Sequence, residues 1–193
     1  MGELVVLRHG QTEWSKSGQH TGVTDLPLLP EGEERARELQ DTLAGRHFAA
    51  VWVSPRQRAR RTAELAGLQA TAVVDDLVEM DYGGYEGRTT AEISAALGRE
   101  WSVWRDPVVP GETPGETLDQ VADRVDRVLA AARPHLAEGD VALVAHGHVL
   151  RVLTARYLQL PAECGKLFAL PAGSYGVLGQ EHARPALTGW GLG

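Results

Sequence analysis

Cysteine is almost absent from this chain: Cys164 is the single one in 193 residues. A lone cysteine cannot form an intramolecular disulfide and is typical of a reducing compartment, so we expect a cytoplasmic location. The sequence also lacks any apolar run near the roughly 20 residues that a membrane-spanning helix needs. The first predicted strand begins at Leu4, which leaves no room for a signal peptide before it. These features argue against a secreted or a membrane protein.

An excess of positive charge is missing as well. Lysine and arginine number 19 against 26 for aspartate and glutamate, which gives a formal net charge of −7. Nucleic-acid backbones demand a basic surface, so this balance argues against DNA or RNA as a partner. Hydrophobic residues make up 43% and charged residues 23% of the chain, ordinary values for a globular protein. Because no linker or repeat divides the sequence, we expect one domain over residues 1–193.

Apolar segments of β type alternate with segments of helical periodicity along the chain. Strands are predicted over residues 4–7, 49–53, 72–74, 141–145, 174–178 and 186–188. Helices are predicted over residues 31–43, 55–65, 90–97, 117–136 and 149–158. This alternation predicts an α/β fold of three layers, a mostly parallel central sheet with helices on both faces.

Local signals place several boundaries. Gly45 is expected to cap the helix that ends at Leu43, and Ser54-Pro55 fits an N-cap followed by a first-turn proline. The run Thr89–Glu92 predicts a capping box. Residues 11–30 are polar and rich in glycine, threonine, aspartate and proline. We expect them to form a long loop, and a loop of that length in a compact domain is usually functional.

Two of the predicted strands end in a histidine followed by glycine. Arg8-His9-Gly10 follows the first strand, and His146-Gly147 follows the strand at 141–145. In open α/β sheets, ligands bind at the carboxyl ends of the strands. Arginine supplies a planar fork of donors to phosphate oxygens, and a neutral histidine nitrogen is a nucleophile. Glycine after the histidine lets an oxyanion approach the backbone closely.

A third strand leads from Ser54 into an arginine-rich helix, and a glycine-rich segment with several carboxylates follows it. A helix N-terminus is a natural anion site to which arginines of the first turns can add. Of the arginines on this helix, Arg60 and Arg61 are expected to lie on a solvated face, which leaves Arg58 as the main candidate and Arg56 as a secondary one. The candidate carboxylates are Glu79, with Asp81 and Glu86 as rivals. Two histidines, two or more arginines and a carboxylic acid are the groups that phosphoryl transfer through a phosphohistidine needs. The set requires neither metal nor cofactor, and we expect none.

Four motifs in order resemble those of the histidine phosphatase superfamily, the phosphoglycerate-mutase-like proteins, from Leu4 to about Gly179. They are R-H-G at Arg8, S-x-x-x-R-A-x-x-T-A from Ser54 to Ala63, E-x-x-x-G-x-Y-E-G from Glu79 to Gly87, and H-G at His146.

The resemblance implies a role for each matching residue. His9 would take the phosphoryl group, while Arg8, Arg58 and His146 would form the phosphate pocket. Glu79 would protonate the leaving alcohol and then help to deprotonate the attacking water.

The resemblance also implies weaker contributions around this core. Ser15, Thr21, Gly22 and Gly147 would offer donors to the phosphate oxygens. Glu86 is expected to bind loop amides, and His148 fits either a substrate contact or a surface residue. Homodimers are common in the family, and nothing in the sequence identifies an interface.

The segment after Glu79 has the short form that resembles the phosphatase branch, so we expect water rather than a second substrate hydroxyl as the acceptor. The chain resembles actinobacterial-type acid phosphatases and, in its motifs, fungal-type sedoheptulose-1,7-bisphosphatases. In the second resemblance, Arg151 and the Ser17–His20 loop would hold a distal phosphate, although this chain is much shorter after Arg151.

The prediction is a broad-specificity phosphatase for small phosphorylated metabolites. The alternatives are a sugar bisphosphatase, a phosphoglycerate mutase and a non-catalytic phosphometabolite-binding module, which the presence of both His9 and Glu79 disfavours.

Overall fold

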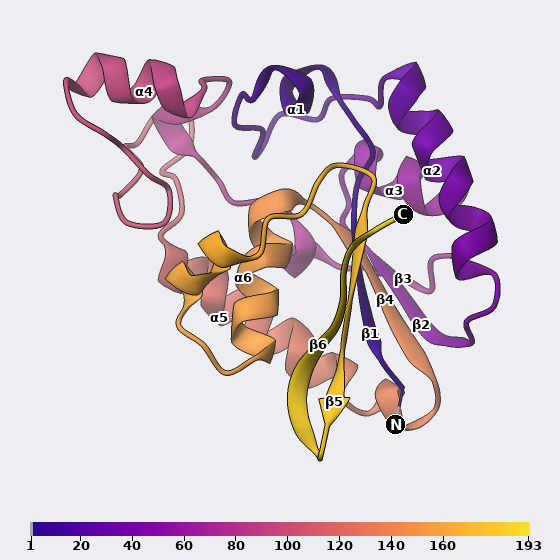
Figure 1. The fold of residues 1–193 in the computed structure, drawn as a ribbon. Coiled ribbons are helices and arrows are strands. Elements are labelled where there is room, and N and C mark those ends of the chain that lie inside the picture. The colour runs from indigo at the N-terminus through magenta and orange to yellow at the C-terminus, as the bar shows by residue number, and fades with distance from the viewer. Residues whose placement is uncertain (1) are drawn as a thin grey trace.

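The computed structural model describes residues 2–193 and contains a six-stranded sheet with helices on both faces (Figure 1). The strand order is β3-β2-β4-β1-β5-β6. The strands are β1 (Leu4–Arg8), β2 (Phe48–Val53), β3 (Ala72–Val73), β4 (Asp140–Ala145), β5 (Tyr175–Glu181) and β6 (Arg184–Leu192). The first four run parallel, whereas β5 is antiparallel to β1 and β6 is antiparallel to β5. The predicted α/β class is confirmed, and the sheet is mixed because the chain ends in a hairpin.

Helices cover the two faces of the sheet because alternate residues of a strand point to opposite faces. Val5 and Leu7 of β1 pack with α2 and α3, whereas Leu4 and Val6 pack with α5 and α6. The α-helices are α1 (Glu13–Ser17), α2 (Pro30–Leu43), α3 (Gln57–Leu65), α4 (Thr90–Leu97), α5 (Leu118–Ala132) and α6 (Gly147–Tyr157). The 3-10 helices are η1 (Asp75–Leu77), η2 (Gly83–Tyr85), η3 (His135–Ala137) and η4 (Ala162–Leu167).

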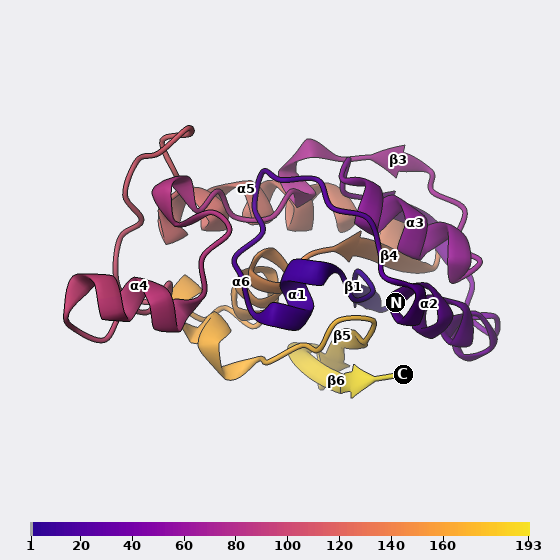
Figure 2. The ribbon, with the colours of Figure 1, turned by 90° about the horizontal axis from the view of Figure 1, so that it is seen from above.

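The carboxyl ends of β1 and β4 lie side by side at one end of the sheet. The helix α1 lies above this end, and α4 lies to one side of it (Figures 1 and 2). The capping box before α4 is confirmed: Thr89 Oγ1 accepts a hydrogen bond from the Glu92 amide, and the Glu92 carboxylate accepts one from the Thr89 amide. We call the segment that joins α4 to α5, residues 98–117, the roof loop. The segment between α1 and α2 crosses the same end of the molecule (Figure 2).

Three expected boundaries were wrong. The segment 11–30 contains a helix, α1, whose N-cap Thr12 exchanges hydrogen bonds with Ser15 in a capping box. Ser54-Pro55 does not begin α3, which starts at Gln57 with Arg56 as N-cap. The cap comes instead from a distant loop, because the Asp25 carboxylate accepts from the Gln57 amide at 3.0 Å. Gly45 does not adopt the left-handed conformation of a C-cap glycine. The C-cap of α2 is Ala44, whose backbone is still helical.

Candidate active site

His9 and His146 follow the neighbouring parallel strands β1 and β4, and the register pairs Arg8 with Ala145. The two imidazoles therefore meet edge to face, with ring centroids 5.1 Å apart. Both rings are buried. His9 Nδ1 lies 2.7 Å from the Gly10 carbonyl. A carbonyl oxygen only accepts, so Nδ1 carries the hydrogen and Nε2 keeps the lone pair that a nucleophile needs.

The surroundings of His9 keep its imidazole neutral. Burial, and then the positive charges of Arg8 and Arg58, hold the pKa of His9 well below its usual value. A cation at this position would be desolvated beside two guanidinium groups. The His9 ring is therefore a neutral nucleophile at mildly acidic pH as well as at neutral pH.

Arg58 and His146 lie together beneath His9 and form a supporting layer. Arg58 Nε donates to His146 Nδ1 at 3.1 Å, so the hydrogen of the neutral imidazole lies on Nε2 and points to Ser54 Oγ at 2.7 Å. The terminal nitrogens of Arg58 donate to the carbonyls of Thr24 and Thr21 at 2.8 and 3.1 Å. Both Arg58 and His146 are fully buried and do not line the cavity described below. These hydrogen bonds hold the two side chains in place beside the site. A contact of His146 with phosphate would require one of its hydrogen bonds to break, whereas Arg58 Nη1 keeps one hydrogen that its hydrogen bond to Thr24 does not use. Their part in a phosphate pocket stays a prediction.

Arg8 is the cation at the base of the cavity. Its Nη1 donates to the Leu170 carbonyl at 2.6 Å, while Nε is buried without a hydrogen-bond partner among residues 2–193. A Cβ at position 147 would lie 3.2 Å from Arg8 Cζ, so the glycine lets the guanidinium lie against the first turn of α6. A buried N–H without an acceptor is costly. An anionic oxygen in the cavity would satisfy it.

Glu79 reaches the same cavity from the loop after η1 and is nearly buried. Its Oε2 accepts the His148 amide and its Oε1 accepts the amides of Val149 and Met80, each at 2.9 Å. The carboxyl group is thus held at the N-terminus of α6, opposite the residues that follow β1. Oε2 accepts a single hydrogen bond and keeps a second lone pair, on which a proton for a leaving group can reside.

The two rival carboxylates are structural. Asp81 accepts hydrogen bonds from the Gly83 amide, the Gly115 amide and the Thr113 hydroxyl. Glu86 accepts from the amides of Gly22 and Thr24, which confirms its expected role of binding loop amides. Because the Gly22 amide is committed to Glu86, and Gly22 does not line the cavity, the expectation that Gly22 donates to phosphate was wrong.

The cavity has a volume of about 460 Å³. Arg8, His9, Glu79 and Gly147 lie in its lining, together with Ser15, His20, Thr21, Tyr82, Trp104, His148 and Arg151. The Ser15 hydroxyl is engaged with the main chain of Thr12, and the Thr21 hydroxyl donates to the Gln19 carbonyl.

The wall opposite His9 is aromatic. The Tyr82 hydroxyl lies 2.6 Å from His148 Nδ1, and the His20 ring packs on Tyr82 with centroids 4.6 Å apart. Burial lowers the pKa of His20 to about 4. Trp104 belongs to this wall, whereas Trp101 is a core residue. Tyr82 was not among the predicted site residues, and its place three residues after Glu79 is the signal that points to it.

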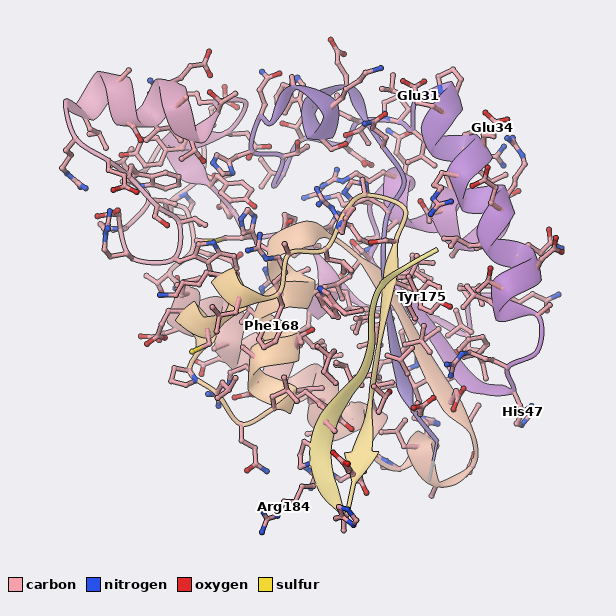
Figure 3. All side chains as sticks on the ribbon, viewed as in Figure 1. Glu31, Glu34, His47, Phe168, Tyr175 and Arg184 are labelled. Carbon is pink, nitrogen blue, oxygen red and sulfur yellow. The ribbon has the colours of Figure 1, made fainter. Side chains whose placement is uncertain are left out.

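Residues without a motif lie elsewhere. His47 is exposed and lies at the opposite end of the sheet from the cavity, as does Arg184 (Figure 3). Arg61 pairs with Glu33 and Glu64 on the outer surface of α3, the solvent-facing role expected for it.

Within residues 2–193, no cluster of three or more His, Cys, Asp or Glu side chains is arranged to hold a metal ion. None of the helices over the same residues is long and apolar enough to cross a membrane.

A buried histidine pair with two arginines and a carboxylic acid at the strand ends defines a phosphate-transfer site on an α/β sheet. The chain belongs to the histidine phosphatase superfamily (branch 1), whose family model matches residues 4–193. It is a phosphatase, a hydrolase of phosphoric monoesters.

Relatives agree with this assignment. The chain is 42% identical over 192 residues to an acid phosphatase of Mycobacterium tuberculosis, covering 98% of this chain and 92% of that protein. It is 39% identical over 186 residues to the sedoheptulose 1,7-bisphosphatase of Saccharomyces cerevisiae, covering 81% of this chain and 67% of that protein. A solved structure of an open reading frame product from Mycobacterium tuberculosis superposes with a TM-score of 0.92 at 39% identity, covering 99% and 97% of the two chains.

Proposed function

We propose that this protein is a metal-independent acid phosphatase of broad specificity that acts on small phosphorylated metabolites through a phosphohistidine. His9 Nε2 attacks phosphorus, and the bond to the leaving oxygen breaks as Glu79 gives that oxygen a proton. Glu79 then takes a proton from water, which attacks the phosphohistidine and releases inorganic phosphate. Arg8 and the first turn of α6 stabilise the negative charge on the transferring group.

The observation that carries this proposal is the pair formed by a neutral histidine and a carboxyl group in one cavity. Histidine is usually protonated below pH of about 6.5 and is then no nucleophile. The lowered pKa of His9 removes that limit, so the neutral nucleophile is present beside the Glu79 carboxyl group at mildly acidic pH. The name of the Mycobacterium tuberculosis relative, an acid phosphatase, supports the same conclusion.

A sugar bisphosphatase is the second candidate, and Arg151 is the observation that favours it. Its guanidinium lies in the lining of the same cavity as Arg8 and His9. A substrate with a second anionic group could therefore place one phosphate on His9 and the other group toward Arg151. The yeast relative is named as a sedoheptulose 1,7-bisphosphatase, which supports this candidate.

Phosphate release from a panel of four substrates tests both candidates. The panel is p-nitrophenyl phosphate, 3-phosphoglycerate, fructose 1,6-bisphosphate and sedoheptulose 1,7-bisphosphate. Broad specificity predicts kcat/KM values within about tenfold of one another, whereas a preference above a hundredfold for a bisphosphate would replace the first candidate by the second. Isomer formation from 3-phosphoglycerate would support a mutase instead. Binding without turnover of any substrate would support a binding module.

The pH dependence of phosphate release is a separate prediction. From pH 7 to pH 5 the rate on p-nitrophenyl phosphate should not fall, because His9 stays neutral over that range. Initial rates in constant-ionic-strength buffers measure this range. A loss of activity centred near pH 6.5 on acidification would contradict the proposed role of His9.

We also place the activity in the cytoplasm, on small substrates and without a nucleic-acid partner. The single cysteine and the net charge of −7 support this placement. A homodimer, common in the family, stays a prediction that size-exclusion chromatography with light scattering would test.

A further inference from the structure

The Trp104 side chain comes from the roof loop and lies in a slot against η4 and α6. The Arg151 guanidinium carbon stacks over its ring at 4.5 Å from the centroid, and the His148 ring lies 5.1 Å away. The slot exists because residue 165 is a glycine: a Cβ there would lie 2.6 Å from Trp104 Cζ3 and 2.9 Å from Cη2. Gly165 does not have a positive φ, so it is space rather than backbone conformation that excludes a side chain.

The same element holds the Arg151 side chain. Arg151 Nε donates to the Gly165 carbonyl and Nη2 donates to the Lys166 carbonyl, both at 3.1 Å. Nη1 makes no hydrogen bond with residues 2–193, and no carboxylate of these residues forms an ion pair with Arg151. The guanidinium plane is therefore fixed by two carbonyls and one aromatic face, which leaves one nitrogen available to a ligand. An arginine held in this way loses little side-chain entropy when it binds an anion.

The electrostatic setting calls for an anion at this place. Arg151 and Arg8 line one cavity, and the charge of Arg8, after burial, is a cause of the lowered pKa of Arg151. Neither cation forms an ion pair within 4.0 Å among residues 2–193, and they repel each other across the cavity, where Glu79 is the carboxylate that attracts both. A substrate that carries negative charge at both ends relieves this repulsion, whereas a monoester with a neutral leaving group does so at one end only.

We propose that Trp104 is a positioning residue that orients Arg151 for substrates with a second anionic group, and that Gly165 makes this position possible. The proposal rests on the proposed phosphatase function and concerns its substrate class. Trp104 acts through Arg151: without the indole, the guanidinium keeps its charge but loses its fixed plane. Discrimination between bisphosphates and monophosphates would then weaken, whereas hydrolysis itself would continue.

A double-mutant cycle with matched substrates tests this proposal. The measured quantity is the ratio of kcat/KM for fructose 1,6-bisphosphate to that for fructose 1-phosphate, in the wild type and in Trp104→Ala, Arg151→Ala and the double variant. Trp104→Ala should lower the ratio about tenfold, mainly through KM for the bisphosphate, as loss of a partly buried cation–π contact predicts. In the Arg151→Ala background, the same change should alter the ratio less than twofold. Trp104→Phe should restore most of the ratio because a phenyl face can still stack on a guanidinium.

Gly165→Ala is an independent approach to the same slot, with Leu167→Ala as the matched control on the same element. The added methyl group displaces the indole and should lower the ratio as Trp104→Ala does. Leu167 is 66% exposed, and its truncation should leave the ratio at the wild-type value. The proposal would be overturned if Trp104→Ala changed the kcat/KM ratio equally in the wild type and in the Arg151→Ala background. It would also be overturned if the wild-type protein showed a kcat/KM ratio near one for the bisphosphate over the monophosphate. In either case, phosphate release from p-nitrophenyl phosphate by the wild type would still support the phosphatase function, whereas its absence would refute that function separately.

Discussion

His9 combines a free Nε2 lone pair with a neutral ring, the two properties that make a histidine a phosphate nucleophile. The Gly10 carbonyl fixes the tautomer, and burial beside Arg8 and Arg58 prevents protonation. Substitution His9→Ala should reduce kcat on p-nitrophenyl phosphate to the uncatalysed background, since the proposed covalent intermediate forms on its Nε2. Mass spectrometry of quenched wild-type enzyme should detect one added phosphoryl group, which the variant lacks.

The fold of the His9→Ala variant provides the control. A desolvated imidazole between two cations stabilises the folded state little, so the thermal midpoint should equal or exceed that of the wild type. Circular dichroism measures this midpoint. Activity of the variant above about 1% of wild type would contradict the phosphohistidine mechanism, because removal of a covalent nucleophile usually costs several powers of ten in rate.

At the scale of single residues, the sequence could predict which groups gather but not what each one touches. The place of the R-H-G motif was predictable because parallel strands end together at one end of the sheet, whereas Glu79 was chosen by its place in the E-x-x-x-G-x-Y-E-G motif. The contacts of Arg58 were not, since its partners Thr21 and Thr24 come from a loop 37 and 34 residues away. The hydrogen bond between Tyr82 and His148 likewise joins positions 66 residues apart, which no local pattern encodes.

At the scale of elements, Glu86 connects η2 to the loop that supports Arg58. Its carboxylate accepts the amides of Gly22 and Thr24 at 3.0 Å, and the carbonyls of the same loop hold the Arg58 guanidinium. Glu86→Gln replaces an ionic acceptor by a neutral one and should lower the free energy of unfolding by about 1–3 kcal/mol. It should also lower kcat, because the layer beneath His9 loses its support.

Urea denaturation and initial rates on p-nitrophenyl phosphate measure the two effects of Glu86→Gln. Glu112→Gln is the matched control, since Glu112 is an exposed carboxylate in the roof loop and its substitution should change stability by less than about 0.5 kcal/mol. If Glu86→Gln behaved like this control in both measurements, the loop would not depend on that carboxylate.

Helix caps show why some element boundaries could be predicted and others not. The capping box of Thr89 and Glu92 lies within one turn, so its two partners appear together in the sequence. The equivalent box of Thr12 and Ser15 was overlooked because serine is a rarer partner than glutamate at the fourth position. The cap of α3 is Asp25, which lies 32 residues before Gln57. A cap supplied by tertiary contact leaves no local signal, and the nearby Ser54-Pro55 pair was misleading.

At the scale of the whole molecule, the α/β class followed from the alternation of strands and helices, whereas strand direction at the C-terminus did not. The run at 174–178 has the apolar character of a strand in either direction. Its course beside β1 is antiparallel because the segment after α6 returns to the carboxyl end of β1 before β5 begins, and the hairpin then makes β6 antiparallel to β5. The mixed sheet also brings Leu170 and Ser174, just before β5, to the site edge, where their carbonyls accept from Arg8 Nη1 and the Arg8 amide.

The whole molecule carries a net charge of −7, yet the active site holds four histidines that stay neutral in the folded state, and their neutrality affects the free energy of unfolding. The pKa values of His9, His146 and His148 lie well below the usual value, and that of His20 is about 4. In the unfolded chain all four titrate near pH 6.5. Below that pH the unfolded state binds protons that the folded state does not, so the free energy of unfolding should decrease as the pH falls from 6.5 toward 4. His20 alone accounts for on the order of 3 kcal/mol of this loss at pH 4.

Urea unfolding at pH 7, 6, 5 and 4.5 measures the predicted loss of stability on acidification. His20→Gln should flatten the dependence, because glutamine can still bond to the Thr90 hydroxyl but binds no proton in the unfolded chain. His47→Gln is the control: His47 is exposed at the far end of the sheet, and its substitution should leave the slope unchanged. An equal free energy of unfolding at pH 7 and pH 5 would mean that the buried histidines take up protons in the folded state. In that case His9 would not be the neutral nucleophile on which acid phosphatase activity depends.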